Sequence, residues 1–430
     1  MNQIDAFGEK IISKVKWRFI PFLFLLYFVN YLDRSNLGFA ALGMNKELGI
    51  SMIAYGALTS VFYLPYFLFE VPSNMLLNRY GARKWIARIL ITWGIVTCLA
   101  MWVHNYWQIA AVRFFLGMME AGFLPGIMFY FTLWFPQRER ARVIGIFTSA
   151  LPISLIVAAP ISGWILDHVH WFGYSGWRWL FMIEGIPAVI LGICTLFYLT
   201  SQPSEAKWLS AEEKNWLIEE IKKEDVKKKE HVKIKEIFSN LRTWRLGIVY
   251  GFSSVAASGM TLFLPMVVKE FSKGSNTLVG FLMMLPPGFA AIFTILVGWS
   301  SDKTKERKYH ASGAFAVGLI GLLMSAISPN PVVKMIGIIL GQSAVFSFMP
   351  PFWALSSLFL SGTSAAVGMA IISSCNAFGS FAGGFGSGYF KSIGNNALLA
   401  YYACALLIGL ILLLTLRVKG EKKVAPVRER

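Results

Sequence analysis

The sequence IAYGALTSVFYLPYFLFEVPSNMLLNRYGARKWIARILITWGIVTCLAMWV (residues 53–103) contains two long apolar runs separated by a short basic turn. The runs cover residues 53–77 and 85–103, and the turn between them is NRYGARK. A helix needs about 20 predominantly apolar residues to cross the hydrocarbon core of a bilayer. Each run is long enough, so this stretch predicts two membrane-spanning helices joined by a tight polar turn.

The composition extends this interpretation to the whole chain of 430 residues. Hydrophobic residues make up 56% and charged residues only 15%, whereas soluble domains carry about 25% charged residues. A soluble protein of this composition would expose large apolar patches, which monomers avoid. The first twenty residues are polar and basic without a small-residue cleavage site, so we expect no cleaved signal peptide.

Apolar runs of similar length recur along the chain and predict twelve spans in all. The other ten lie near residues 19–42, 106–135, 142–166, 177–200, 244–268, 276–300, 310–328, 332–360, 364–390 and 395–416. A polar segment rich in Lys and Glu, residues 201–243, separates the first six spans from the last six. We therefore predict an all-α membrane protein with a six-helix bundle in each half. The predicted segments are the bundle 1–200, a cytoplasmic linker 201–243, the bundle 244–417 and a cytoplasmic tail 418–430.

The distribution of Lys and Arg predicts the orientation. With the N-terminus inside, 32 of the 40 fall in inner segments, six in outer segments, and two within spans. Cytoplasmic loops of membrane proteins carry such an excess of positive charge, so we expect both termini in the cytoplasm, at an inner (cytoplasmic) membrane. The net charge of +17 is then explained by insertion, without nucleic-acid binding.

Two equivalent inner loops indicate an internal repeat. The loop after span two is NRYGARK at 78–84, and the loop after span eight is SDKTKERK at 301–308. These loops resemble the signature G-x-x-x-D-R-x-G-R-R/K of the major facilitator superfamily. The first loop has Asn where that signature has Asp, and the second keeps Asp302. The resemblance implies that Arg79, Arg83 and Asp302 take part in inner-gate contacts.

Ionisable residues within the predicted spans are concentrated in the first half: Asp33, Arg34, Glu70, Arg113, Glu120 and Glu184. Such residues are costly in a bilayer and are functional candidates. Arg113 and Glu120 share a helix face but are separated by about 10.5 Å along the axis, too far for a direct salt bridge. Asp33 and Arg34 lie at similar depth. Glu70 and Glu184, the latter near Arg178 in the sequence, are interpreted as structural.

Two arginines and two carboxyl groups facing one cavity suit the binding of an organic acid together with a proton. The planar guanidinium group binds a carboxylate through two hydrogen bonds and stays charged. Buried Asp and Glu can take up protons. The alternative is a purely structural network that ties spans one and four together.

The motifs NYLDRSN (30–36) and RFFLGMMEAGFLPG (113–126) resemble the span-one and span-four signatures of the anion:cation symporter family within that superfamily. Members transport organic anions such as galactonate, tartrate, phthalate and hydroxyphenylacetate. The resemblance implies that Asp33 and Glu120 are proton-coupling sites. It also implies that Arg34 and Arg113 bind the substrate or take part in coupling.

Three further residues are weaker candidates for substrate binding. Tyr63 and Tyr66 lie one turn apart on span two, and their alternative role is that of core aromatics. Asn376 lies deep in span eleven, where similar family members offer an amide to the substrate; helix packing is its alternative.

We therefore predict a proton-coupled importer of a small organic carboxylate that works by alternating access. The alternatives are an exporter or exchanger of organic compounds and a non-transporting nutrient sensor of the same fold. The chain has no convincing catalytic or phosphate-binding motif, so an enzyme is not expected. The four cysteines form no CxxC pair, and neither a metal site nor a cofactor beyond the coupling proton is predicted. We expect a monomer whose partners are substrate, proton and lipid.

Overall fold

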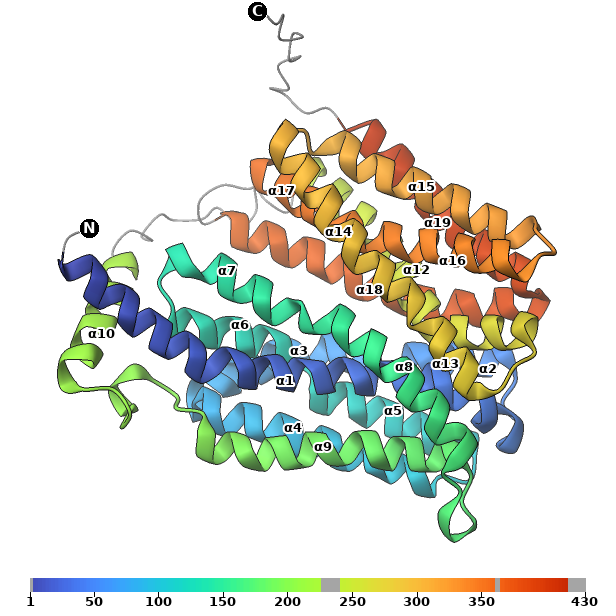
Figure 1. Cartoon of the computed structure of the whole chain (residues 1–430), viewed down its shortest axis with the longest axis horizontal. Coiled ribbons are helices and arrows are strands. Elements are labelled where there is room, and N and C mark those ends of the chain that lie inside the picture. The colour runs from blue at the N-terminus through green and yellow to red at the C-terminus, as the bar shows by residue number, and fades with distance from the viewer. Residues whose placement is uncertain (1–2, 226–239, 360–363, 417–430) are drawn as a thin grey trace, which may run out of the picture.

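A computed structural model describes residues 3–225, 240–359 and 364–416, and the described elements are helices joined by short loops (Figure 1). The division of the chain at residues 200 and 244 stays a prediction. Residues 226–239 of the predicted linker and the predicted tail 418–430 lie outside the described residues.

The six predicted spans of the first half coincide with helices or with pairs of consecutive helices. These are α1 (Gln3–Glu47), α2 (Met52–Val61) with α3 (Tyr63–Tyr80), α4 (Ala82–Leu99) with the short η1 (Ala100–Trp102), α5 (Tyr106–Glu120) with α6 (Phe123–Trp134), α7 (Gln137–Thr148) with α8 (Ala150–His168), and α9 (Gly176–Tyr198). The short helices η2 (Trp171–Gly173) and η3 (Pro203–Glu205) lie in loops, and the polar α10 (Ala211–Asp225) follows the bundle.

The second half repeats this arrangement. Its helices are α12 (Leu241–Ser272), α13 (Asn276–Met283) with α14 (Leu285–Thr304), α15 (Lys308–Ile327), α16 (Pro331–Ser347) with α17 (Met349–Phe359), α18 (Ser364–Ile393) and α19 (Asn395–Leu414). Ten of these spans are long and apolar enough to cross a membrane by length and hydropathy. The 45-residue α1 and the 30-residue α18 complete the twelve. The predicted class, twelve spanning helices in two bundles of six, is confirmed.

Proline explains where the paired helices are interrupted. Proline lacks an N–H donor, and its ring clashes with the carbonyl of the preceding turn, so a helix is interrupted or kinked just before it. Each interruption between two α-helices lies two or three residues before a proline: Phe62 before Pro65, Gly122 before Pro125, Ser149 before Pro152, Met284 before Pro286, and Phe348 before Pro350. The change from α4 to the 3-10 helix η1 has no proline after it.

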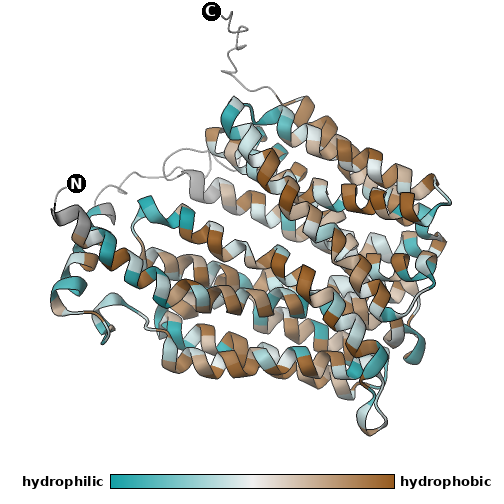
Figure 2. Cartoon of the chain, viewed as in Figure 1, coloured by the Kyte–Doolittle hydropathy of each residue, from teal (hydrophilic) through white to brown (hydrophobic). Residues whose placement is uncertain are grey.

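Hydrophobic residues predominate in the long central parts of the helices, and hydrophilic residues gather toward the helix ends and loops (Figure 2). Many large apolar side chains on this outer surface are exposed, among them Phe197, Ile295 and Ile327. A monomer in water avoids contiguous apolar surface of this kind. The outer surface of the two bundles is therefore suited to contact lipid instead of water.

The two bundles contact each other mainly at the end of the molecule where α1 ends and α2 begins, which we call the far end (Figure 1). There α1 packs on α12, α2 on α18, and α8 on α13. Gly56 permits the second contact, since a Cβ atom at this position would lie 2.7 Å from the Cα atom of Gly388. The Tyr55 hydroxyl also donates a hydrogen bond across the interface to the Leu262 carbonyl at 3.1 Å.

Candidate functional site

Glu120 and Arg34 form a partly buried ion pair between α5 and α1. Glu120 Oε1 accepts hydrogen bonds from Arg34 Nε at 2.6 Å and from Asn30 Nδ2 at 2.7 Å. The Glu120 side chain is buried, whereas the Arg34 side chain is 28% exposed. Glu120 Oε2 has no hydrogen-bond partner. The structure therefore joins two of the predicted site residues and leaves one carboxylate oxygen available.

Arg113 lies on the same face of α5 but has no comparable partner. Its side chain is buried, its Nε atom makes no hydrogen bond, and it forms no ion pair with a described residue. Its guanidinium carbon lies 4.8 Å from the centre of the Phe62 ring, which provides a cation–π contact. Asp33 interacts with it electrostatically through space. Arg113 is thus a buried cation whose hydrogen-bonding groups are largely unused.

The two arginines share an aromatic surrounding. The Arg34 guanidinium carbon lies 5.7 Å from the Phe62 ring centre, so both cations approach this ring. Tyr31 and Tyr66 approach Arg34 at 5.6 and 5.2 Å. Tyr63 is close enough to interact electrostatically with both arginines. The predicted residues Tyr63 and Tyr66 therefore lie with the charged cluster.

The close approach of α5 to the interruption between α2 and α3 depends on glycine. A Cβ atom on Gly117 would lie 2.1 Å from the Phe62 carbonyl oxygen, so a side chain would force the helices apart. Gly117 lies between Arg113 and Glu120 in the sequence. The close contact between α5 and Phe62 brings the Phe62 ring to the two arginines, and this contact requires glycine at position 117.

Asp33 makes no hydrogen bond to the Arg34–Glu120 pair, although it is adjacent to Arg34 in the sequence and close enough to Glu120 to interact with it electrostatically. It is 1% exposed, and its Oδ1 atom accepts a hydrogen bond from Asn36 Nδ2 at 3.0 Å. Its Oδ2 atom is buried and has no hydrogen-bond partner. The hydroxyl of Thr97 on α4 is the nearby group that interacts with this carboxyl. The two predicted coupling carboxyls therefore occupy different surroundings.

Glu184 does not pair with Arg178, its neighbour in the sequence. Arg178 pairs instead with Glu47 at 2.9 Å and donates to the carbonyls of Met101 and Val103. Glu184 is 2% exposed and accepts one hydrogen bond, from Ser162 at 2.8 Å. The sequence could not show this, because the partners come from other helices.

In the second bundle, Asn376 of α18 accepts a hydrogen bond from the hydroxyl of Ser254 on α12 and is half-buried. One turn earlier on α12, Tyr250 stacks on Phe352 at 5.5 Å and contacts Trp353. Tyr250 also interacts electrostatically with Tyr31 of the first bundle. Sequence reasoning missed Tyr250, whose only signal was a hydroxyl group in the first third of span seven.

The predicted inner-gate residues are not brought together in this conformation. Arg79 is exposed and contacts the adjacent Tyr80 ring, and Arg83 is half-buried. Asp302 pairs with Arg307 of its own loop at 2.5 Å. In this conformation, Arg79 and Asp302 therefore contact residues of their own half of the chain.

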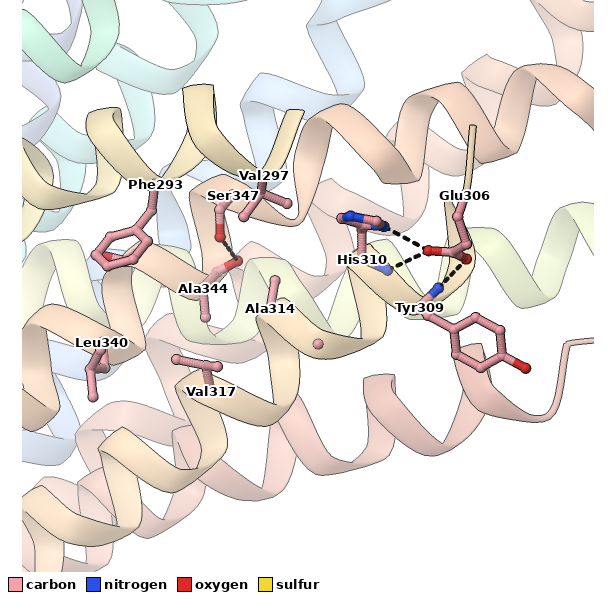
Figure 3. A pocket seen from close by; sticks show the side chains of 12 residues that line it. Phe293, Val297, Glu306, Tyr309, His310, Ala314, Val317, Leu340, Ala344 and Ser347 are labelled. Atoms are coloured by element: carbon pink, nitrogen blue, oxygen red, sulfur yellow. Dashed lines mark hydrogen bonds and ion pairs between the residues drawn. The ribbon is translucent and has the colours of Figure 1, made fainter. Parts of the chain in front are cut away.

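A separate cavity of about 450 Å³ lies in the second bundle, between α14, α15 and α16 (Figure 3). Its lining is mainly apolar, with Phe293 and Val317 among the contributing side chains. Its polar edge is formed by Glu306 and His310, whose Oε2 and Nδ1 atoms are 2.7 Å apart. This cavity contains none of the predicted site residues, so it is not the site described above.

Comparison with known proteins agrees with the fold. The model of the Major Facilitator Superfamily matches residues 23–384. A putative tartrate transporter of Agrobacterium vitis is 41% identical over 98% of both chains. A quinolone resistance transporter of Acinetobacter baumannii is 36% identical over 97% of both chains. Among solved structures, the inward open xylose transporter XylE of E. coli superimposes with a TM-score of 0.74 at 15% identity, covering 94% of this chain and 98% of that one.

Proposed function

The chain belongs to the Major Facilitator Superfamily, and from this premise we propose that it is a proton-coupled symporter for a small organic carboxylate. It is a multi-pass membrane transporter and not an enzyme. The finer assignment concerns the substrate, the coupling ion and the direction. Import across the cytoplasmic membrane, with both termini inside, is the direction that we propose.

The main support for a carboxylate substrate is the unpaired state of Arg113. A buried charge is stable only when it is paired and hydrogen-bonded. Arg113 has only a cation–π contact and a through-space interaction with Asp33. An anionic substrate would supply the missing charge and accept two parallel hydrogen bonds from the guanidinium group. A cationic or neutral substrate would leave the positive charge of Arg113 without an ion-pair partner.

The ion pair of Arg34 and Glu120 supports a coupling mechanism. Arg34 is held by Glu120 through its Nε atom. Protonation of Glu120 would remove the negative charge from this pair and release Arg34 toward a substrate carboxylate. Substrate and proton would then bind together, which is the requirement for symport. The nearby Asp33 is the second proposed proton carrier.

The contacts between the bundles support alternating access. The hydrogen bonds and close glycine contacts described above lie at the far end, which would face the outside with the termini in the cytoplasm. The Arg79 and Asp302 loops make no such contact. This arrangement corresponds to a conformation closed to the outside, and transport would require the contacts at the two ends to exchange.

Export of an organic compound is the second candidate, because the relative of 36% identity is named as a quinolone resistance transporter. The two candidates predict opposite fluxes in proteoliposomes. Purified protein should accumulate labelled tartrate, or another compound from a panel of small mono- and dicarboxylates, when the interior is made alkaline. An uncoupler should abolish this accumulation. Extrusion of a quinolone without carboxylate uptake would instead establish export.

A further inference from the structure

A third buried carboxyl group, Glu184, lies next to Asp33 and has no role in the mechanism so far. Glu184 belongs to α9, which packs against α1, α4 and α8. Its Oε1 atom accepts a hydrogen bond from Ser162 at 2.8 Å, and its Oε2 atom is buried without a partner. Asp33 and the Asn36 amide are close enough to Glu184 to interact with it electrostatically. The Asn36 amide therefore lies near two carboxyl groups.

The groups that face Glu184 contain no cation. From α1 they are Asp33 and Asn36, and from α8 the hydroxyl of Ser162. On α4, the hydroxyl of Thr97 lies near Asp33, and the thiol of Cys98 lies near Gly185, the residue after Glu184. On α9 itself, Arg178 is engaged by Glu47. A Glu184 carboxylate would thus be a buried anion beside another acid. Burial of an unpaired anion is strongly unfavourable, and such a group takes up a proton instead.

The count of buried charges around the cluster gives the same result. Arg34 and Arg113 supply two positive charges. Asp33, Glu120 and Glu184 would supply three negative charges if all were ionised, and the half-buried Glu70, which interacts with Arg34, would add a fourth. Glu120 is paired with Arg34, and Asp33 interacts with Arg113. Glu184 is the acid left without an arginine. A proton on Glu184 removes the one negative charge of this set that has no arginine beside it.

We propose that Glu184 is a third proton-binding carboxyl, which is protonated in this conformation and shares its proton with Asp33. In the transfer, the O–H bond of Glu184 breaks and an O–H bond forms on Asp33, so the negative charge moves to Glu184. No other reactant is needed. Glu184 lies eight residues from the first residue of α9, about 12 Å along the helix from the far end. It would therefore hold a proton between the far end and Asp33.

Infrared difference spectroscopy tests the protonation directly. The purified full-length protein should show the carbonyl stretch of a buried carboxylic acid, and Glu184→Gln should lose this band. Glu212→Gln, on the exposed side of α10, is the matched control and should keep it. Glutamine resembles a protonated glutamate and can still accept the Ser162 hydrogen bond, so the melting temperature should be retained. A band of full intensity in folded Glu184→Gln would overturn the proposal.

A sodium titration and a transport assay complete the test. Stabilisation of the wild type by Na⁺ at constant pH, absent in Glu184→Gln, would show that the site binds sodium and would also overturn the proposal. The coupling role, but not the protonation, rests on the proposed function. In proteoliposomes, Glu184→Gln should lose uptake driven by a proton gradient and keep counterflow exchange. Lack of carboxylate transport by the wild type would contradict the proposed function and leave the infrared result valid.

Discussion

Arg113 and Arg34 differ in their partners, and this difference predicts how each tolerates lysine. Arg113 has no ion pair to lose, so Arg113→Lys should fold normally. Lysine lacks the planar pair of donors, and loss of a charge-assisted hydrogen bond worth roughly 1.5–3 kcal/mol should weaken carboxylate binding about ten- to a hundredfold. Melting temperature and Kd, measured on the same preparation, check this. A lower melting temperature with normal Kd would indicate a structural role.

Arg34→Lys is the informative comparison, because Arg34 is bound to Glu120 through Nε. Lysine should form a different ion pair with Glu120, and both stability and affinity should fall. Equal effects of the two substitutions would mean that the unpaired state of Arg113 has no importance for binding.

The carboxyl groups predict a pH dependence with a definite sign. If protonation of Glu120 releases Arg34, the affinity of the wild type for carboxylate should rise as the pH falls. Glu120→Gln imitates the protonated acid, so it should bind substrate with an affinity that hardly changes with pH. Glu120→Gln and Asp33→Asn should each lose concentrative uptake and retain exchange. Gradient-driven uptake at the wild-type level in both variants would exclude these residues from coupling.

At the scale of single helices, the interruption between α5 and α6 depends on Gly122. Its φ angle of +86° is in the left-handed region, and a Cβ atom would lie 2.4 Å from Ser73 Oγ. We expect Gly122→Ala to lower the free energy of unfolding by about 1–2 kcal/mol from the backbone alone. The clash with Ser73 adds to this loss. Ser73→Ala should not recover it, because the Ser73 Cβ atom would still lie 2.7 Å from the new Cβ atom and the hydrogen bond from Trp85 Nε1 to Ser73 Oγ would be lost.

The matched control is Gly145→Ala in α7, where a Cβ atom would meet no neighbour within 4 Å. Alanine favours a helix over glycine, so this variant should be as stable as the wild type or slightly more stable. Chemical or thermal unfolding in one detergent checks both positions. Equal stability of Gly122→Ala and the wild type would show that the interruption does not need a left-handed residue.

The helices also show which features were predictable from the sequence. The twelve spans follow from local hydropathy, because the bilayer imposes a length on every apolar run. The position of each interruption follows from proline once the structure is known, although the same sequence rule also applies to Pro160 and Pro187, which lie within uninterrupted α8 and α9. Neighbouring helices decide which prolines interrupt a span.

The site was predictable as a set of charges but not as a set of pairs. The cost of burying charge singles out Asp33, Arg34, Arg113 and Glu120 without a structure. The pairing of Arg34 with Glu120 and the separate surroundings of Asp33 depend on helix rotation, which a single sequence does not contain. Glu184 shows why sequence alone does not predict such contacts. Its partners Ser162 and Asn36 belong to two other helices, α8 and α1.

At the scale of the whole molecule, the close contact of α2 with α18 predicts a way to trap the other conformation. A Cβ atom on Gly56 would lie 2.7 Å from Gly388 Cα, so Gly56→Trp cannot be accommodated while the bundles meet at the far end. We expect this variant to stay open at the far end and to lose transport, because alternating access requires closure there. Gly313→Trp, where a Cβ atom meets nothing within 4 Å, is the matched control.

Spin labels in a background without native cysteines measure this change. Lys46 and Lys273 are exposed at the far end of the two bundles, and Lys84 and Lys303 are exposed at the opposite end. In Gly56→Trp the distance between labels at Lys46 and Lys273 should increase, and that between Lys84 and Lys303 should decrease. The opposite signs are essential, because a rigid rocking of the bundles about the site closes one end as it opens the other. An increase at both ends would indicate that the bundles separate, and alternating access about the Arg113 site would then be wrong.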